Sequence, residues 1–539
     1  MTLMIYNTLT RQKEAFTPIA APTVQMYCCG VTVYDYCHLG HARCYIVWDT
    51  VRRYLMWRGY QVRYVQNFTD IDDKILNRAQ AEGTTMQAIA DRYTEAYFED
   101  MARLNVLEAD DYPRATHTLD GIQRLIHDLE QAGYAYAAGG DVYYAVRKFD
   151  TYGKLSGRKL DDMRAGASGR VATSGDGEKK QDPFDFALWK GAKPEEPYWE
   201  SPWGNGRPGW HIECSAMVRD RLGDTIDIHM GGGDLVFPHH ENEIAQSEAA
   251  TGHPLAHIWM HNGMVNVGGE KMSKSLGNFT TIRQLLDAPN APDPMAIRLF
   301  VLQGNYRKPL DFTAQTIAAA QNSWETLSEG LLFGDQFGDR LGWSSLERDG
   351  SYAQPGASAY SNRVQSAMDD DFNTAGALAV LFELAKELRR QGNVITHQGE
   401  PDAPRDRLFA LWQTLVGLAQ ILGLEASAAT TNAEAEQLAD AEVEALIAQR
   451  RAARRLIRGP PARVRGRTTR LRSIRRTPVR EAFLRLENLG LLDIVPQRGT
   501  IVSPMRAAEF HKSQFMREAF ELALVRRAVK LEDNSELCK

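Results

Sequence analysis

The N-terminal part of the chain contains a strand–helix–strand pattern of apolar and polar positions. Val24–Cys29 is a short apolar run typical of a buried strand, Ala42–Arg58 has helical character, and Gln61–Val65 has the pattern of a second strand. Crossovers of this kind build parallel sheets, whose ligands bind at the carboxyl ends of the strands. We therefore expect an α/β fold, with the polar segment Asn67–Lys74 on the ligand-binding edge of the sheet.

The pattern changes between about residues 120 and 200. Short aromatic strands are expected at Tyr134–Tyr136 and Asp141–Ala145, and they lead into a loop rich in glycine, serine and charge at Gly166–Asp182. Sheet elements resume at Thr225–Met230 and Ile258–Val267. The middle segment therefore has the character of an insertion into the sheet domain.

From about residue 310 onward the chain has a helical pattern. Asn373–Arg390 carries apolar residues at a spacing of 3.6, and Arg405–Leu424 and Glu434–Arg455 follow the same pattern. Three such stripes in succession predict a helical bundle after the sheet domain.

Composition and charge narrow the class of protein. A chain of 539 residues is long enough for three or four domains. Six cysteines are too few for a disulfide framework, the N-terminus has no signal-peptide core, and no apolar run could span a bilayer, so a cytoplasmic protein is expected. The net charge of −6 conceals a segment, Arg450–Arg480, with thirteen arginines and no acidic residue, so the rest of the chain is acidic. An acidic body does not by itself indicate nucleic-acid binding.

Two short cationic motifs lie far apart in the sequence. His38-Leu39-Gly40-His41 stands at the expected strand-to-helix turn, where backbone N–H groups and the helix dipole favour a phosphate. Lys271-Met272-Ser273-Lys274-Ser275 lies on a loop flanked by glycines, and its lysines can neutralise charge on a triphosphate. Each motif alone is weak evidence, but their order and context suggest formation of an adenylate. At this point the chain resembles the class I aminoacyl-tRNA synthetases.

A second set of residues has the chemistry of a metal site. The segment around Pro238 is typical of a helix start, with the proline in the first turn. His239 and Glu243 are four residues apart and would lie on one face of that helix, so both could reach one ion. Together with the thiols of Cys29 and Cys214 they would form a donor set that suits Zn²⁺. A buried cysteine is more often only a small apolar residue, so spacing alone leaves both readings open.

The segments around these residues resemble the cysteinyl-tRNA synthetases over roughly residues 1–450. The resemblance is carried by Met26–Asp35, Gly209–Met217 and Phe237–Glu243, with further similarity at Thr8–Lys13 and Asn67–Lys74. It implies one zinc ion held by Cys29, Cys214, His239 and Glu243. It also implies a pocket for the amino acid cysteine, lined by Tyr27, Thr69, Trp210, His229 and Asp234. The expected ATP contacts are His38, Gly40, His41 and Lys274, and Lys271 assists them.

The implied reaction has two steps. The carboxylate of L-cysteine attacks the α-phosphate of ATP, which binds with Mg²⁺, and His38, His41, Lys271 and Lys274 stabilise the developing charge. The acyl group then passes to the terminal adenosine of tRNA-Cys. A zinc ion would favour a thiolate over the hydroxyl of serine, which shape alone rejects only weakly. The metal is thus expected to select the substrate, and the protein is expected to be a monomer.

The resemblance and the sequence pattern together predict the division of the chain. The expected parts within the resemblance are a Rossmann-like catalytic domain whose halves are 1–120 and 206–310, with the KMSKS loop in the second half, an inserted subdomain at 121–205 and a helical anticodon-side bundle at 311–449. Beyond it we expect an arginine-rich linker or frameshifted segment at 450–475 and a truncated GntR-like winged-helix fragment at 476–539.

Past Arg454 the sequence departs from the family pattern. Arg476–Glu487 and Gln497–Thr500 resemble the recognition helix and wing of GntR-type winged-helix regulators, without that domain's first two helices. Half a winged helix cannot bury its own core, so specific DNA binding is not expected. A gene fusion, a frameshift and a wrongly assigned coding region all remain open, and we favour the last two. The resemblance therefore does not extend to anticodon recognition.

Two alternative functions are open. The cysteine:glucosaminyl-inositol ligases of mycothiol synthesis resemble the same catalytic half but lack a long helical bundle, so the helical pattern after residue 310 favours the synthetase. A transcription regulator acting through the C-terminal piece is the alternative from a different class.

Overall fold

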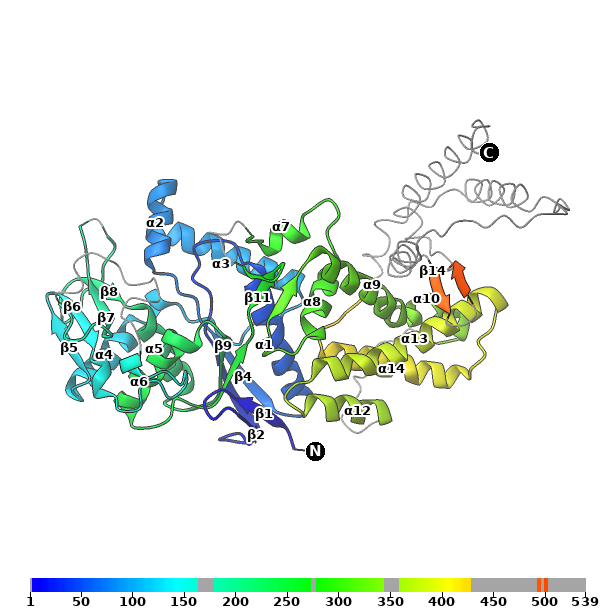
Figure 1. Ribbon diagram of the computed structural model, residues 1–539, viewed down its shortest axis with the longest axis horizontal. Helices are drawn as coiled ribbons and strands as arrows, with labels where there is room; N and C mark the ends of the chain where they lie inside the picture. Colours follow the sequence, from blue (N-terminus) through cyan, green and yellow to red (C-terminus); the bar gives the residue numbers. More distant parts are fainter. Residues whose placement is uncertain are drawn as a thin grey trace, which may run out of the picture. The chain divides into compact units, whose positions relative to one another are not determined.

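The computed structural model describes residues 2–162, 179–194, 196–272, 278–343, 358–427, 492–495 and 499–502. The chain divides into two compact units, Met1–Glu436 and Gln437–Lys539. The fold that positions the site belongs entirely to the first unit (Figure 1).

A four-stranded parallel sheet forms the centre of the first unit. Its strand order is β10-β9-β3-β4, with bounds β3 Thr23–Cys28, β4 Gln61–Gln66, β9 Ile226–Gly232 and β10 Ala256–Asn262. In register, Tyr27 lies opposite Val65 on one side and His229 on the other. A short antiparallel hairpin precedes the sheet, formed by β1 (Met4–Asn7) and β2 (Gln12–Ala15). The parallel sheet confirms the predicted α/β class.

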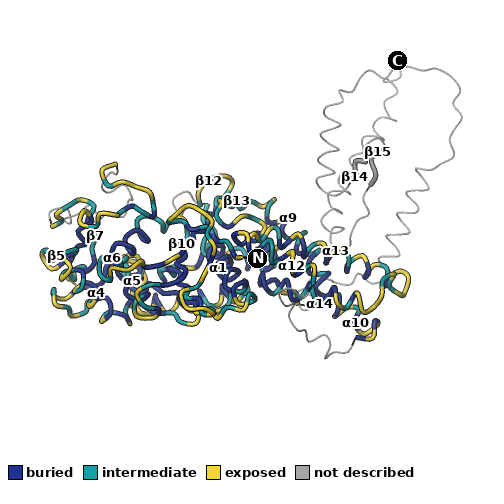
Figure 2. Tube along the Cα trace, turned by 90° about the horizontal axis from the view of Figure 1, so that it is seen from below, coloured by how far each residue is buried: buried dark blue, intermediate teal, exposed yellow. Residues whose placement is uncertain are grey.

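Helix α1 (Leu39–Trp57) makes the crossover from β3 to β4. It packs on β4, β9 and β10 and on helices from the later part of the chain, and most of its residues are buried, as the dark blue interior in Figure 2 illustrates. After β4 come α2 (Asp73–Glu82), which begins at the Asp72 cap and ends at Gly83 in the left-handed conformation, α3 (Met86–Arg103) and the turn η1 (Ala115–His117). The first crossover thus agrees with the predicted strand–helix–strand pattern.

The middle segment contains an antiparallel sheet of order β5-β6-β7-β8 next to a helix. The elements are α4 (Leu119–Gln131), β5 (Ala135–Ala138), β6 (Asp141–Tyr144), η2 (Val146–Lys148), η3 (Leu160–Asp162), β7 (Phe186–Gly191) and β8 (Gly206–Pro208). A hydrophobic core that includes Ile122, Leu125 and Trp189 supports this segment, and buried residues of the helices that follow it contribute to the same core. The two short strands agree with the expectation, whereas most of the predicted glycine-rich loop lies outside the described residues.

The chain then returns to the parallel sheet through α5 (Trp210–Leu222), and β9 is followed by the wide helical turn η5 (Val236–His240) and α6 (Glu241–Thr251). The predicted helix start, with Pro238 in its first turn, agrees with the structure. Phe237 is extended, with φ −141° and ψ 133°, and helical backbone follows it, first in the wide turn and then in the regular helix from Glu241. This arrangement brings His239 and Glu243 together.

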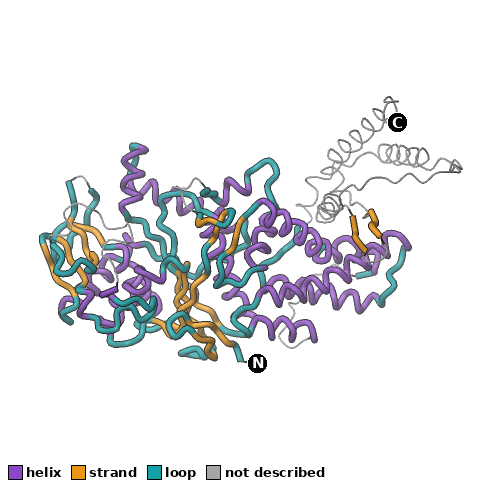
Figure 3. Tube along the Cα trace, in the orientation of Figure 1, coloured by secondary structure: helices purple, strands orange, loops and turns teal. Residues whose placement is uncertain are grey.

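A three-stranded sheet of order β12-β11-β13 follows β10. Its bounds are β11 Val265–Val267, β12 Glu270–Lys271 and β13 Leu310–Phe312, and α7 (Ile282–Leu286) and α8 (Pro294–Gln303) lie between the last two strands in sequence. The described residues from 314 to 421 contain helices and loops but no strand (Figure 3). These helices are α9 (Ala314–Leu331), α10 (Phe333–Leu341), α12 (Ala359–Met368), α13 (Thr374–Gln398) and α14 (Arg405–Ile421).

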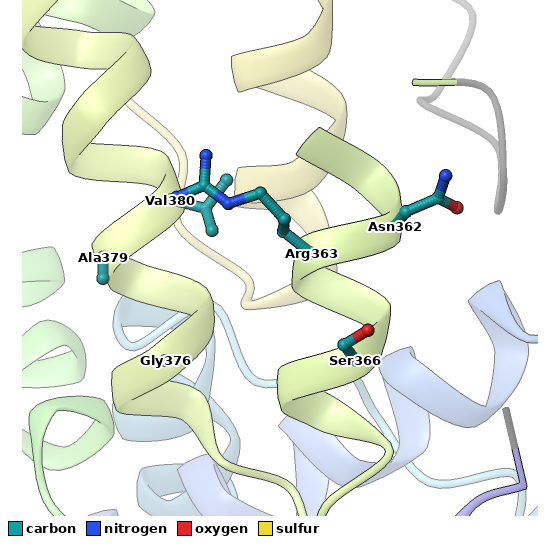
Figure 4. Close-up of a pocket in the computed structure, with 6 residues that line it drawn as sticks. All are labelled: Asn362, Arg363, Ser366, Gly376, Ala379 and Val380. Carbon is teal, nitrogen blue, oxygen red and sulfur yellow. The ribbon is translucent and has the colours of Figure 1, made fainter. Parts of the chain in front are cut away.

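The helices after β13 pack on one another and on α1 and α8, which confirms the predicted bundle. An open pocket lies between α12 and α13, on the bundle and remote in sequence from every predicted site residue (Figure 4); it is lined by Asn362, Arg363, Ser366, Gly376, Ala379 and Val380. The predicted helix at Glu434–Arg455 lies outside the described residues.

In the second unit the structure describes the backbone of one antiparallel hairpin, formed by β14 (Leu492–Val495) and β15 (Gly499–Val502). The remaining residues from 428 onward, including the arginine-rich segment, lie outside the described part. Among the helices that are described, none combines the length and apolar character needed to cross a membrane.

Candidate metal and nucleotide site

The four predicted metal ligands come together at the carboxyl edge of the parallel sheet. Cys29 follows β3, Cys214 lies on α5, His239 on η5 and Glu243 in the first turn of α6. Their ligand atoms all lie within 4.8 Å of one another. The Sγ atom of Cys29 is 3.2 Å from Glu243 Oε1 and 3.8 Å from Cys214 Sγ, and His239 Nε2 is 3.1 Å from Glu243 Oε1.

All four side chains are buried, with 5% of Cys29 exposed and less of the other three. Burial raises the pKa of the Cys29 thiol. The Cys29 contact lowers the pKa of Cys214, but burial and two carboxylates raise it more. Burial also raises the pKa of Glu243, yet the imidazoles of His229 and His239 together bring it below its ordinary value. The negative charge of the buried carboxylate is removed from water, beside two thiols. A bound cation would stabilise this set of donors.

Two further histidines adjoin the cluster. His229 Nε2 lies 2.9 Å from Glu243 Oε2, and the His229 ring stacks on Trp259 at 4.4 Å. His240 Nδ1 bonds to His261 Nε2 at 2.8 Å, while His240 Nε2 is buried without a hydrogen-bond partner. Cys29, His229, His240 and Glu243 therefore form a second possible ligand group that shares two members with the first.

Burial keeps the outer histidines neutral. It lowers the pKa of His240 far below the ordinary value and that of His261 to about 3. His261 Nδ1 contacts the hydroxyl of Thr8 at 2.8 Å, which completes a hydrogen-bonded chain from the N-terminal hairpin to His240. Sequence reasoning missed His240 and His261; the adjacent histidine pair at 239–240 was the only signal for the first of them.

His239 is held by residues of α5. Its Nδ1 atom lies 2.9 Å from His211 Nδ1, and the Trp210 ring lies 4.2 Å from its ring. Ligating histidines commonly use their second nitrogen in such a hydrogen bond, which fixes the tautomer. With Nδ1 engaged in this way, Nε2 is the atom that faces the cluster.

The structure brings most residues predicted for the cysteine pocket close to the cluster. Tyr27 is buried with its ring 5.3 Å from that of His229, and Thr69 donates its hydroxyl to Glu213 Oε2 at 2.9 Å, beside Cys214. Asp234 differs from these: it is exposed in the turn after β9, next to Gly232, and the described contacts do not join it to the cluster.

The first cationic motif forms the start of α1. His38 is the N-cap, and its Nδ1 accepts hydrogen bonds from the backbone N–H groups of Gly40 and His41 at 3.0 and 3.3 Å. The His38 and His41 rings stack at 3.7 Å. Two imidazoles are thereby fixed at a helix N-terminus, where a phosphate is favoured.

Part of the second motif adjoins this turn. A Cβ placed on Gly40 would lie 3.7 Å from Met272 Cε. The segment after the motif also contacts the turn, because Leu39 N–H bonds to Thr280 O at 3.3 Å. Lys271 is exposed in β12. Lys274 lies outside the described residues, so its predicted ATP contact stays a prediction.

Comparison with known proteins agrees with this geometry. The family described as "tRNA synthetases class I (C) catalytic domain" matches residues 15–322, and the "DALR domain" matches residues 363–426. The chain is 70% identical over 455 residues to "Cysteine--tRNA ligase" of Synechococcus elongatus, covering 84% of this chain and 93% of that protein. It is 65% identical over 457 residues to the protein of that name from Gloeothece citriformis, with the same coverage.

Among solved structures, the chain is similar to the LeuRS of Agrobacterium radiobacter, from a ternary complex with tRNA and LeuAMS. The TM-score is 0.50 with 13% identity, covering 76% of this chain and 85% of that one, which supports the fold alone. The profile matches and the close relatives place this chain in the class I tRNA synthetases, as a member of the cysteine–tRNA ligase family.

Proposed function

We propose that this protein activates L-cysteine with ATP to cysteinyl-adenylate and transfers the cysteinyl group to tRNA-Cys. The observation that carries the proposal is the buried group of two thiols, an imidazole and a carboxylate, which lies at the same sheet edge as the His38–His41 turn. The 70% identity to a cysteine–tRNA ligase supports the same reaction.

The metal that best fits this group is Zn²⁺. Cys29, Cys214, His239 and Glu243 would hold it, since sulfur and imidazole ligands in a set of four are typical of zinc. The alternative group with His229 and His240 offers only one sulfur and is less suited to it. Bound zinc would supply a Lewis acid that favours a thiolate over a hydroxyl, and so would distinguish cysteine from serine.

The residues around the cluster would orient the amino acid. Tyr27, Trp210 and His229 lie next to the proposed ligands and would form the walls of the side-chain pocket, excluding water. Thr69 is fixed by its bond to Glu213 and would contribute one polar edge of this pocket. We retain Asp234 as a pocket residue only as a prediction from the family resemblance.

The α1 turn would bind ATP. His38, Gly40 and His41 present a helix N-terminus to the phosphates, and Lys271 with Lys274 would neutralise charge as the cysteine carboxylate attacks the α-phosphorus and pyrophosphate leaves. Mg²⁺ is expected to accompany the ATP. These side chains act by position and charge, with no covalent intermediate on the protein.

The alternative acceptor is the amino sugar of the related ligases. The bundle from α9 to α14 and the DALR match at 363–426 favour tRNA. The test is a charging assay with tRNA-Cys and, separately, with glucosaminyl-inositol, in the presence of ATP and cysteine. Charging of tRNA-Cys supports the proposal, and ligation to the amino sugar without tRNA charging would contradict it.

The other expectations remain proposals. We infer a cytoplasmic monomer divided at 1–120, 121–205, 206–310 and 311–449, with an arginine-rich linker or a frameshifted segment at 450–475. Both family matches end by residue 426, so the winged-helix resemblance of 476–539 gains no support from them, and we propose no DNA-binding role for it.

A further inference from the structure

Arg43 is a buried arginine just inside the first turns of α1. Its side chain is 1% exposed, and its guanidinium donates to backbone carbonyls from two distant segments. Nη1 bonds to Met264 O at 2.7 Å, and Nη2 bonds to Tyr306 O at 3.1 Å and also to Lys308 O. One side chain therefore joins α1 to the two segments that lead into the parallel strands β11 and β13.

This arginine has an unusual environment for a buried charge. None of the ion pairs found among the described residues includes Arg43, so its acceptors are carbonyl dipoles alone. Burial lowers its pKa to about 10, which still leaves it charged at neutral pH. Burying a charge without an opposite charge costs free energy of folding. We therefore explain the presence of Arg43 by the segments that it holds in position, and not by a gain in stability.

The acceptors of Arg43 stand where the second cationic motif is anchored. Met264 O also accepts from Leu310 N–H at 3.0 Å, the bond that begins the pairing of β11 with β13. Strand β11 also pairs with β12, and in this pairing Asn266 of β11 lies opposite Lys271 of β12. The backbone of Arg43 belongs to the start of α1, directly after the His38–His41 turn.

We propose that Arg43 is a positioning residue that sets the spacing between the His38–His41 turn and the strands that carry Lys271, and thereby the geometry of ATP binding. The inference rests on the proposed ATP-dependent activation of cysteine. An arginine is suited to this role because its planar fork can reach several carbonyls at once, whereas a lysine ammonium is a single point on a flexible stem.

Arg298 provides a matched control. It is also wholly buried and donates to backbone carbonyls, those of Leu104, Asn105 and Leu422, but it pairs with Asp49 and has no bond to the β11 or β13 segments. Arg43→Lys and Arg298→Lys thus make the same chemical change at two buried sites, and only the first connects the two motifs.

The experiment measures cysteine-dependent ATP–pyrophosphate exchange at varied ATP and varied cysteine, together with urea unfolding of each variant. Because displacing reacting groups by about 1 Å can cost on the order of 100-fold, we expect Arg43→Lys to lower kcat/KM for ATP by about 10-fold or more. KM for cysteine should stay within about twofold of wild type, and Arg298→Lys should lose stability with little change in KM for ATP.

The outcomes separate this inference from the proposed function. If wild-type protein shows no cysteine-dependent exchange, the proposed function is wrong. If wild type is active but Arg43→Lys changes the ATP parameters no more than Arg298→Lys does, Arg43 has no positioning role. Should Arg43→Lys not fold, Arg43→Gln removes the buried charge and keeps an amide NH₂ group as donor. The same loss in kcat/KM for ATP is expected, and wild-type ATP parameters would overturn the inference.

Discussion

Replacing Cys214 by serine should remove most of the affinity for zinc while leaving the fold intact. The side chain is 2% exposed and supplies one of four ligand atoms within 4.8 Å. A serine hydroxyl is a poor zinc ligand, because it does not ionise near neutral pH as a metal-bound thiol does. Asn67 Oδ1 lies 3.7 Å from the sulfur and could accept a bond from the new hydroxyl, which limits the cost of burying it.

The size of the effect follows from sharing the binding free energy among the ligands. Four-ligand zinc sites bind with roughly 10–16 kcal/mol, so one ligand accounts for about 3 kcal/mol, or a loss on the order of 100-fold in affinity. Cys44→Ser is the control: this thiol is also buried, but it accepts from Trp48 Nε1 on α1 and is outside the cluster.

The assay is zinc retention during titration with a competing chelator, together with the thiolate absorption of the Co²⁺-loaded protein. Wild type and Cys44→Ser should retain about one metal ion per chain, and Cys214→Ser should release it at far lower chelator concentration. Equal retention by Cys214→Ser and wild type would refute the assignment of Cys214 as a ligand.

Three further predictions concern other parts of the chain. His38→Ala removes the α1 cap, so it should lower the unfolding free energy by about 1 kcal/mol and cut pyrophosphate exchange by about 100-fold; unchanged exchange would argue against a role in charge stabilisation. Burial raises the pKa of Asp100 to about 6, so the folded protein holds this proton more tightly than the unfolded chain does. The unfolding free energy of wild type should therefore fall by up to about 3 kcal/mol relative to that of Asp100→Asn as the pH rises from about 4 to 6. Urea unfolding of both proteins across this range measures the difference, and a constant difference would contradict the prediction. A chain ending at Glu436 should keep cysteine-dependent exchange, since the described site lies in the first unit; an inactive but folded product would show that residues 437–539 are required.

The sequence was sufficient to predict the features that depend on the local pattern of apolar and polar residues. Apolar periodicity predicted β3, α1 and β4, because a buried strand and an amphipathic helix each leave a regular signature. The four proposed ligands were identifiable because each lies in a distinctive segment, and the structure places them together.

Other features depend on contacts between distant segments and leave no local signal. The bond between His240 and His261 joins η5 to β10, and the bonds of Arg43 join α1 to residues 264 and 306–308. The wide turn that joins the extended Phe237 to the regular helix α6 is a backbone detail that the position of Pro238 does not reveal.

The most direct test of the account is ATP–pyrophosphate exchange with cysteine and with serine, on zinc-loaded and metal-stripped protein. The account predicts exchange with cysteine on the loaded protein, little exchange with serine, and loss of the cysteine signal after stripping that returns when zinc is restored. Exchange with serine comparable to that with cysteine, or exchange unaffected by removal of the metal, would contradict it.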